Sequence, residues 1–390
     1  MKWVGVGVLV CSSFLWAGSD PKHPPTLVIT NVNVVDTRRG EVRPHMAVAI
    51  KDGLIAAIMK FAIIEEGPNV QVVNGNDGFL VPGLWDMKTH VKMGAPDSQK
   101  ASFEFDVANG VTGVRNIDAD QISVAPDSGE LRPEVEPARP LWLQRTRPAE
   151  IPNGWRHTIE DLNEIRASCC VRSGARPATD AHDGRDSERA RDEYGSEQAR
   201  RVFEEISDHA TWVVPGLVAD EASAVASDEE SPKPQMKSAF EAGQTVPSPQ
   251  NQLLRDIELV RTMHRAGVQF LAGTGGNLDN LSQETIAEEL DLLVKSGLTP
   301  LEALQSATIN PALCMAKLDR YGVVEGAHIA DLVLLDASPL KEIRNVGKVR
   351  AVVLRGRYLA RSDLDAMLKQ LRDRTHRQEK TAAIAPAKAE

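Results

Sequence analysis

Residues 79–90 read FLVPGLWDMKTH, and this stretch divides the chain into two parts of different character. Before it, short runs rich in β-branched residues follow one another and end at Pro82-Gly83, a pattern typical of short strands. From Leu84 onward, apolar strand-like runs alternate with helical patterns. The sequence therefore predicts a β region before this stretch and an α/β region after it.

A second group of predicted strands lies near the other end of the chain. Thr26–Val35 opens the first group, whereas Ala330–Asp336 and Val349–Leu354 belong to the second, separated from the first by about 240 residues. We expect the two groups to form one small composite β-sandwich from residues 26–82 and 322–360.

The segment between the two groups, residues 83–321, is predicted to alternate strands with helices. Such alternation indicates βα units and a parallel sheet or barrel. Thr299 is a suitable N-cap because Pro300 follows it at the first helical position. Glu288 and Glu289, on a preceding helix, are expected on a solvated face. The predicted strands are Leu84–His90, Val111–Ile117, Pro140–Thr146, His157–Asp161, Thr211–Leu217 and Val268–Thr274.

Composition limits the partners of the chain. The 390 residues carry a net charge of −10, and aromatic residues make up 4%. A nucleic-acid surface needs clustered Lys and Arg, and base stacking needs aromatic side chains. We therefore expect a protein that binds no nucleic acid.

Residues 1–19 are typical of a secretory signal peptide. Lys2 precedes an apolar run from Trp3 to Trp16, and the small residues Ala17-Gly18-Ser19 allow cleavage before Asp20. A run of about 15 apolar residues is short for a membrane span of about 20. We expect a secreted or periplasmic protein with no stable membrane span after cleavage; a membrane anchor or lipid attachment at Cys11 are the alternatives.

The remaining cysteines, Cys169, Cys170 and Cys314, form no metal-binding spacing. We expect ordinary thiols rather than a disulfide framework. Residues 361–390 are expected to form a helix from Ser362 to Arg374, followed by a tail.

Several motifs resemble the amidohydrolase superfamily, in its imidazolonepropionase-like and prolidase-like branches. The resemblance implies a TIM-type (β/α) barrel beside a composite β-sandwich. It also implies hydrolysis of C–N bonds in a small-molecule amide or dipeptide by metal-activated water. The motifs, in chain order, are FLVPGLWDM at 79–87, ANGVTGVR at 108–115, the segment 266–274, GLTPLEAL at 297–304, and the segment 322–336 that ends in ADLVLLD.

The same resemblance implies a site for zinc or another divalent metal, with ligands at the C-terminal ends of the barrel strands. The family has His-x-His on strand one, a carbamylated Lys or Glu on strand four, single His residues on strands five and six, and a catalytic Asp after strand eight. Here Lys88 replaces the first His of the pair, Asp161 stands at the strand-six position, and Gly275 replaces the catalytic Asp. The predicted metal ligands are therefore His90 and Asp161, with His157 as a compensating alternative, and no catalytic carboxylate is predicted.

Two strands are also expected to be missing. Pro140–Thr146 fits strand three of the barrel, and Ile159–Leu162 fits strand six. About a dozen residues separate these two segments, whereas the two βα units expected between them need roughly 60 residues. We therefore expect a barrel that lacks about two βα units, and six strands do not close an eight-stranded barrel. Whether the gap between Arg147 and His157 is a true deletion stays open.

Two functions from different classes remain. The first is an amidohydrolase with a rebuilt metal site that contains His90 and Asp161. The second is a non-catalytic pseudoenzyme or scaffold without metal, in which His90 is a remnant at the barrel mouth. A positive role for Lys88, such as binding a carboxylate substrate, is an alternative. Metal content and hydrolysis of small amides distinguish the two.

Overall fold

The computed structural model describes residues 27–60, 70–89, 96–116, 134–137, 170–172, 194–208, 211–219, 221–222, 249–275 and 285–384. The predicted signal peptide, the predicted ligands His90 and Asp161, and two predicted strands (Pro140–Thr146 and His157–Asp161) lie outside these residues.

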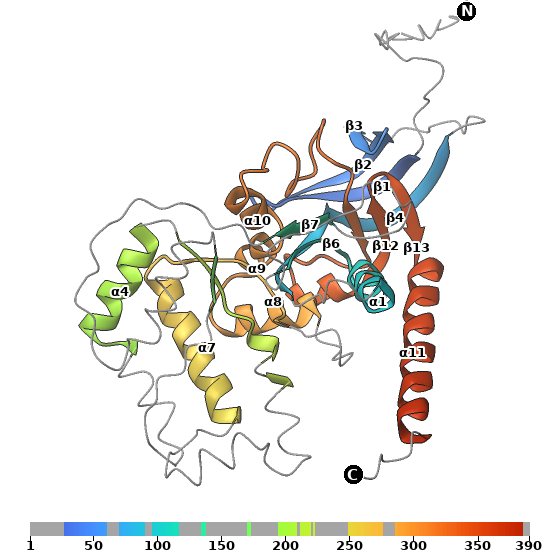
Figure 1. The fold of residues 1–390 in the computed structure, drawn as a ribbon. Helices are drawn as coiled ribbons and strands as arrows, with labels where there is room; N and C mark the ends of the chain where they lie inside the picture. Colours follow the sequence, from blue (N-terminus) through green and yellow to red (C-terminus); the bar gives the residue numbers. More distant parts are fainter. Residues whose placement is uncertain are drawn as a thin grey trace, which may run out of the picture.

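A seven-stranded mixed sheet combines the two ends of the chain (Figure 1). Its strand order is β13-β12-β11-β4-β1-β2-β3. β4 joins the two ends because it pairs with β1 in parallel on one side and with β11 antiparallel on the other. The strands are β1 (Leu27–Asp36), β2 (Glu41–Lys51), β3 (Leu54–Lys60), β4 (Gln71–Pro82), β11 (Leu332–Leu335), β12 (Val349–Leu354) and β13 (Arg357–Ala360).

This sheet has a core of its own. Alternate side chains of β1, such as Leu27 and Ile29, pack with Leu332 and Leu334 of β11 and with Val353 of β12. Apolar residues two positions apart lie on the same face of a strand. The strands from the two ends of the chain therefore bury a common face of the sheet. The described strands of this region form a single sheet, and its second layer, the sandwich, stays a prediction.

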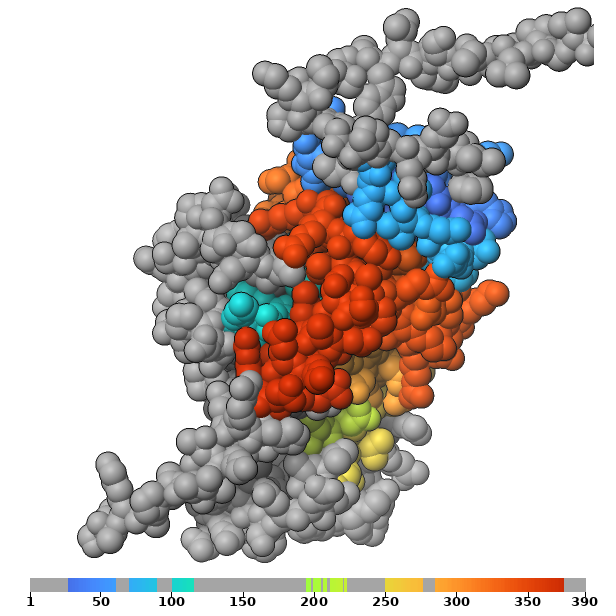
Figure 2. All heavy atoms as spheres, turned by 90° about the vertical axis from the view of Figure 1, so that its right-hand side faces the viewer, coloured from blue at the N-terminus to red at the C-terminus, as the bar shows by residue number. Residues whose placement is uncertain are grey.

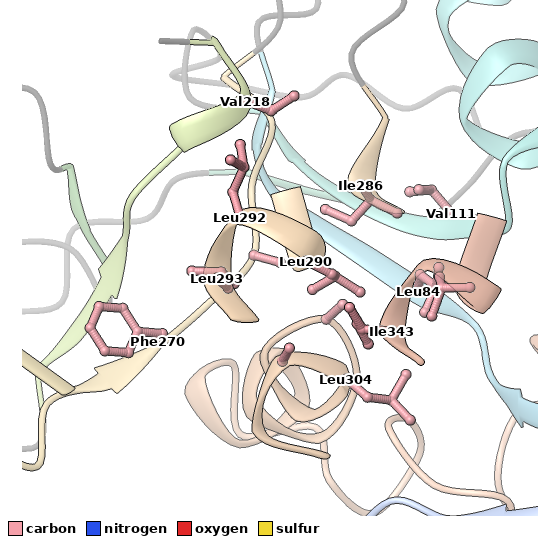
Figure 3. Packing of buried hydrophobic residues seen from close by; sticks show 14 of the residues in the cluster. Leu84, Val111, Val218, Phe270, Ile286, Leu290, Leu292, Leu293, Leu304 and Ile343 are labelled. Atoms are coloured by element: carbon pink, nitrogen blue, oxygen red, sulfur yellow. The ribbon is translucent and has the colours of Figure 1, made fainter. Parts of the chain in front are cut away.

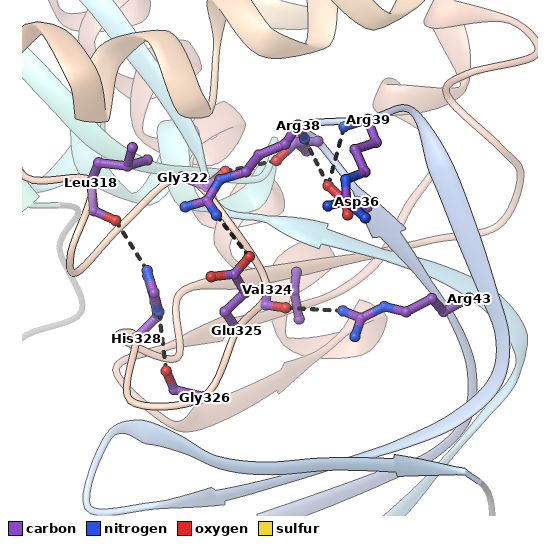
Figure 4. A network of polar contacts seen from close by, with 11 residues as sticks. Asp36, Arg38, Arg39, Arg43, Leu318, Gly322, Val324, Glu325, Gly326 and His328 are labelled. Carbon is purple, nitrogen blue, oxygen red and sulfur yellow. Dashed lines mark hydrogen bonds and ion pairs between the residues drawn. The ribbon is translucent and has the colours of Figure 1, made fainter.

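Polar contacts fasten the segment before β11 to the β1–β2 hairpin (Figure 4). The Thr37 hydroxyl donates to the Gly322 carbonyl over 2.9 Å, and Arg43 donates to the Val324 carbonyl over 3.2 Å. Arg38 forms an ion pair with Glu325 at 3.0 Å. The segment that returns from the middle of the chain is therefore tied to residues near its start.

Six short parallel strands follow the β1–β4 region. They form two ladders, β5-β6-β7 and β8-β9-β10. Two backbone hydrogen bonds connect the ladders, because Met87 N donates to Ala272 O (2.9 Å) and Gly275 N donates to Lys88 O (2.8 Å). The strands are β5 (Leu84–Thr89), β6 (Val111–Asn116), β7 (Glu134–Pro137), β8 (Cys170–Arg172), β9 (Trp212–Val214) and β10 (Gln269–Phe270).

Four of these strands, β5, β6, β9 and β10, lie within the predicted ranges. The other two, β7 and β8, were not predicted. They contain four and three residues, which is too short for an alternating pattern to be recognised. Among the described strands no ladder joins β7 to β8, so the predicted loss of two βα units stays a prediction.

Helices cover the parallel strands and enclose the main core (Figures 1 and 3). Leu290 and Leu293 of α8 meet Leu84 of β5, Phe270 of β10 and Leu304 of α9 in this core. The helices are α1 (Pro96–Ala108), α4 (Glu197–Asp208), α7 (Pro249–Arg265), α8 (Ile286–Lys295), α9 (Pro300–Ser306), α10 (Ile309–Cys314), the 3-10 helix η2 (Ile343–Gly347) and α11 (Arg361–Ile384).

Helix starts agree well with the sequence. Thr299 caps α9 through a capping box with Glu302, and Pro300 occupies the first turn, which confirms the predicted N-cap. Thr285 caps α8 in the same way with Glu288.

The C-terminal helix α11 extends ten residues beyond its predicted end at Arg374. It leaves the sheet directly after β13 and lies on the face seen in Figure 2. Leu364 and Leu371 are buried, and Arg374 forms an ion pair with Glu104 of α1 at 3.7 Å. The described helices contain none that is long and apolar enough to cross a membrane.

Cys314, at the C-terminal end of α10, is disulfide-bonded. The prediction of an ordinary thiol was therefore wrong for this residue. Cysteine spacing says nothing about pairing between residues that are distant in sequence, so the sequence could not reveal this bond.

Candidate functional site

Strand β5 carries two charged side chains on one face, at the end of the parallel sheet where active sites of such folds lie. Asp86 and Lys88 are two residues apart, so both point to the same side of the strand. All six residues of β5 are buried. This burial distinguishes the pair from the surface charges of the molecule.

Hydrogen bonds to three donors hold the carboxylate of Asp86. The backbone N–H groups of Lys88 and Thr274 donate to its Oδ1 over 3.0 and 3.1 Å, and the Thr274 hydroxyl donates to its Oδ2 over 2.6 Å. Thr274 follows β10, so Asp86 connects the ends of β5 and β10. The sequence reading missed Asp86, although its position two residues before Lys88 could have indicated it.

The Lys88 side chain extends between the segments that follow β9 and β10. A Cβ placed on Gly216 would lie 2.7 Å from the Lys88 ammonium nitrogen. A Cβ placed on Gly275 would lie 3.3 Å from Lys88 Cε and 3.4 Å from its Nζ. Both glycines have positive φ, +68° and +65°, a conformation that L-residues rarely adopt. These two glycines therefore leave the space that the ammonium occupies.

Glu289 of α8 completes the group. Its carboxylate accepts the backbone N–H of Gly216 at Oε1 (3.0 Å) and that of Val218 at Oε2 (2.8 Å). Glu289 is 0% exposed, so the prediction of a solvated face was wrong for it. The neighbouring Glu288 is exposed and forms the capping box of the helix with the N-cap residue Thr285.

Helical spacing explains why the two glutamates differ. The buried apolar residues of α8 include Ile286, Leu290 and Leu293. Glu289 lies three residues after Ile286 and four before Leu293, on the same side of the helix. The helical spacing of Glu289 from the apolar residues of α8 could therefore have indicated from sequence that Glu289 is buried.

Burial controls the protonation of these acids. Loss of hydration raises the pKa of Glu289 to about 8, although the Val218 N–H and the Lys88 charge act in the opposite direction. Burial raises the pKa of Asp86 to about 6, against the hydrogen bonds from Thr274 and Lys88. Asp106 of α1 is also buried, and its pKa is raised well above the usual value, first by burial and then by the charge of Asp86.

These shifts predict that the protein loses stability as the pH rises from about 4.5 to about 8. In this range Glu289 ionises in the unfolded chain, where its pKa is 4.5, before it ionises in the folded one. The folded state then binds more protons than the unfolded state, so the free energy of unfolding falls as pH rises. Asp86 acts with the same sign between 3.8 and about 6. Urea denaturation at a series of pH values measures this slope.

The Glu289→Gln variant is the matched control, because glutamine has the same shape and does not titrate. We expect this variant to have a clearly smaller slope between pH 6 and 8, where the Asp86 contribution is over. An unchanged slope in this window would show that Glu289 does not titrate as described.

The described residues do not fit a divalent metal. An ammonium has no lone pair to donate and repels a cation, and Lys88 places one at this site. Gly275 provides no carboxylate. Within the described part of the chain, no group of three or more His, Cys, Asp or Glu side chains could hold a metal ion. His90 and Asp161 lie outside the described residues, so their proposed role as ligands stays a prediction.

Known proteins resemble this chain in sequence and in fold. Residues 179–359 match the model of the Amidohydrolase family. An adenine deaminase of Listeria monocytogenes is 25% identical over 365 residues, which cover 87% of this chain and 59% of that protein. The chain thus spans about 59% of the length of this curated relative.

Solved structures extend the likeness to the whole fold. An Xaa-Pro dipeptidase with methionine bound in its active site has a TM-score of 0.57 and 17% identity, and the match covers 86% of this chain and 99% of that one. A putative prolidase from Bifidobacterium longum has a TM-score of 0.56 and 19% identity, with 89% and 100% covered. At these identities the likeness shows the fold, which is the TIM-barrel α/β fold of such enzymes. The family match over residues 179–359 and this likeness in fold support membership of the amidohydrolase superfamily.

Proposed function

We propose that this protein is related to amidohydrolases that break C–N bonds in small molecules, and that its metal-dependent catalysis is impaired. The reaction class follows from the relatives, because an adenine deaminase and an Xaa-Pro dipeptidase both act on C–N bonds. One observation supports the proposed impairment, the Lys88 ammonium beside Gly275. A small amide, a dipeptide or a purine is the expected ligand class.

The chemistry explains why this one feature matters. Metal ions in such sites lower the pKa of a bound water and polarise the scissile bond. A carboxylate positioned as a general base typically contributes a factor of about 10² to 10⁴ to the rate. Gly275 is predicted to stand where the family has this carboxylate, so this contribution would be lost even if His90 and Asp161 bind a metal.

A non-catalytic protein without metal is the second candidate. Glu289 and Asp86 favour it, because both carboxylates accept hydrogen bonds from backbone N–H groups and experience the Lys88 charge. Acids engaged in this way stabilise the ends of the strands. Such a protein would retain the fold as a scaffold or as a binder of small molecules.

Metal content and turnover of the purified chain test both candidates. The substrates are adenine, Xaa-Pro dipeptides and N-acyl amino acids, with an adenine deaminase and an Xaa-Pro dipeptidase as positive controls. We expect turnover at least about 100-fold below that of the controls, in line with loss of the general base. Turnover equal to that of the controls, with stoichiometric zinc, would contradict impairment. A complete lack of turnover and of metal would favour the second candidate.

A further inference from the structure

The Lys88 ammonium lies at the meeting point of three elements. The side chain starts on β5, and its tip reaches Gly216, after β9, and Gly275, after β10. The backbone holds the same meeting point together, because Gly275 N donates to Lys88 O over 2.8 Å. A positive charge is therefore fixed where the parallel strands end.

Two buried acids interact with this charge. Lys88 interacts electrostatically with Asp86 on its own strand and with Glu289 on α8. Lys88 is 8% exposed, Asp86 is 2% exposed and Glu289 is 0% exposed. Buried carboxylates require a compensating cation or proton, because charge in a low-dielectric interior is unfavourable without a partner.

Lys88 and Gly275 fit each other sterically. A Cβ at position 275 would lie within 3.4 Å of the ammonium nitrogen and 3.3 Å of the carbon that carries it. Contacts at these distances are tight, so the neighbouring lysine tip would have to shift to admit any larger residue. The position of the Lys88 side chain therefore depends on the absence of a side chain at Gly275.

We propose that the Lys88 ammonium is a built-in cation that replaces a bound divalent metal in compensating Asp86 and Glu289, so that the fold is stable without metal. This role concerns stability and does not require turnover. It can therefore hold or fail independently of the proposed function.

A double-mutant cycle on the whole chain tests the role. The cycle is run at about pH 9, above the raised pKa of Glu289 (about 8), so that its carboxylate is ionised in the folded state. Lys88→Met keeps most of the apolar stem and removes the positive charge, which leaves this ionised carboxylate without the Lys88 charge. We expect the melting temperature (Tm) to fall by about 5 °C, as for loss of one partner of a buried ion pair. The matched control is Lys295→Met on α8, which removes a half-exposed lysine paired with Asp291 and should shift the Tm by less than about 1 °C.

The second half of the cycle uses Glu289→Gln. If Lys88 compensates Glu289, Lys88→Met lowers the Tm less in a chain that already carries the neutral Glu289→Gln substitution than in the unaltered chain. The double variant should then recover at least half of the Tm that Lys88→Met alone removes. If Lys88→Met alone does not fold, recovery of folding in the double variant gives the same answer. Additive effects, or a double variant that also fails to fold, would overturn the proposal.

The metal arm uses the unaltered chain. We expect EDTA, followed by dialysis, to leave the Tm unchanged within about 1 °C, and zinc chloride or manganese chloride to produce no increase. Elemental analysis should find less than about 0.1 metal ion per chain. A stoichiometric metal whose removal lowers the Tm by several degrees would overturn the proposal, whatever the variants show.

Discussion

Replacing Glu289 by alanine should lower the free energy of unfolding by about 4 kcal/mol. The substitution leaves the N–H groups of Gly216 and Val218 without their acceptor in a buried site. Above its raised pKa of about 8, it also removes a negative charge near Lys88. Urea denaturation monitored by tryptophan fluorescence measures the loss at fixed pH.

The adjacent residue provides the control for this prediction. Glu288→Ala removes an exposed glutamate from the capping box of α8, and such a loss costs about 1 kcal/mol. The two variants lie on the same helix and remove the same side chain, so the difference reports burial. Equal losses would mean that Glu289 does not hold the segment after β9.

Replacing Trp85 by alanine should have an effect of similar size, about 4 kcal/mol, because a large core side chain is removed. Trp85 on β5 is 1% exposed. Its ring meets Tyr321 edge-on at 5.5 Å between centroids. A Cβ on Gly113 of β6 would lie 2.3 Å from the ring, so the ring packs directly on that strand. Scanning calorimetry of the variant measures the loss.

Trp85→Phe fills most of the same space and should cost clearly less than the alanine variant. Trp212→Phe, at a half-buried tryptophan on β9, is the second control. It tests whether replacing any tryptophan by phenylalanine lowers the stability as much as Trp85→Phe does. A Trp85→Ala chain as stable as Trp85→Phe would show that the cavity closes, in contradiction to the tight packing on Gly113.

Much of the architecture could be predicted from sequence. Long β-branched runs such as the one in β1 identify strands directly, and the sequence TPLE at 299–302 contains the cap, the proline and the box residue of α9. These signals are local in sequence, so they can be recognised without knowledge of the fold. The resemblance to the amidohydrolase superfamily was likewise recognisable because the motifs that carry it are contiguous in sequence.

The candidate site was predicted only in part. Lys88 and Gly275 were predicted to replace family residues, but their contact could not be foreseen because they lie 187 positions apart in sequence. Glu289 was assigned to solvent because a pair of adjacent glutamates resembles a surface pattern. Strands β7 and β8 are too short for periodicity, and the disulfide of Cys314 depends on the tertiary structure.

The position of β4 between β1 and β11 has a consequence for folding during synthesis. β1 and β4 are complete once Pro82 is made, but the β11 strand that covers the other edge of β4 is finished about 250 residues later. At about 5–20 residues per second, this delay lasts roughly 10–50 s. During that time an apolar strand edge is open to pairing with other chains. Folding of this protein should therefore depend on factors that cover the free edge of β4 while the rest of the chain is synthesised. Misfolding in the cell should begin at this edge of β4.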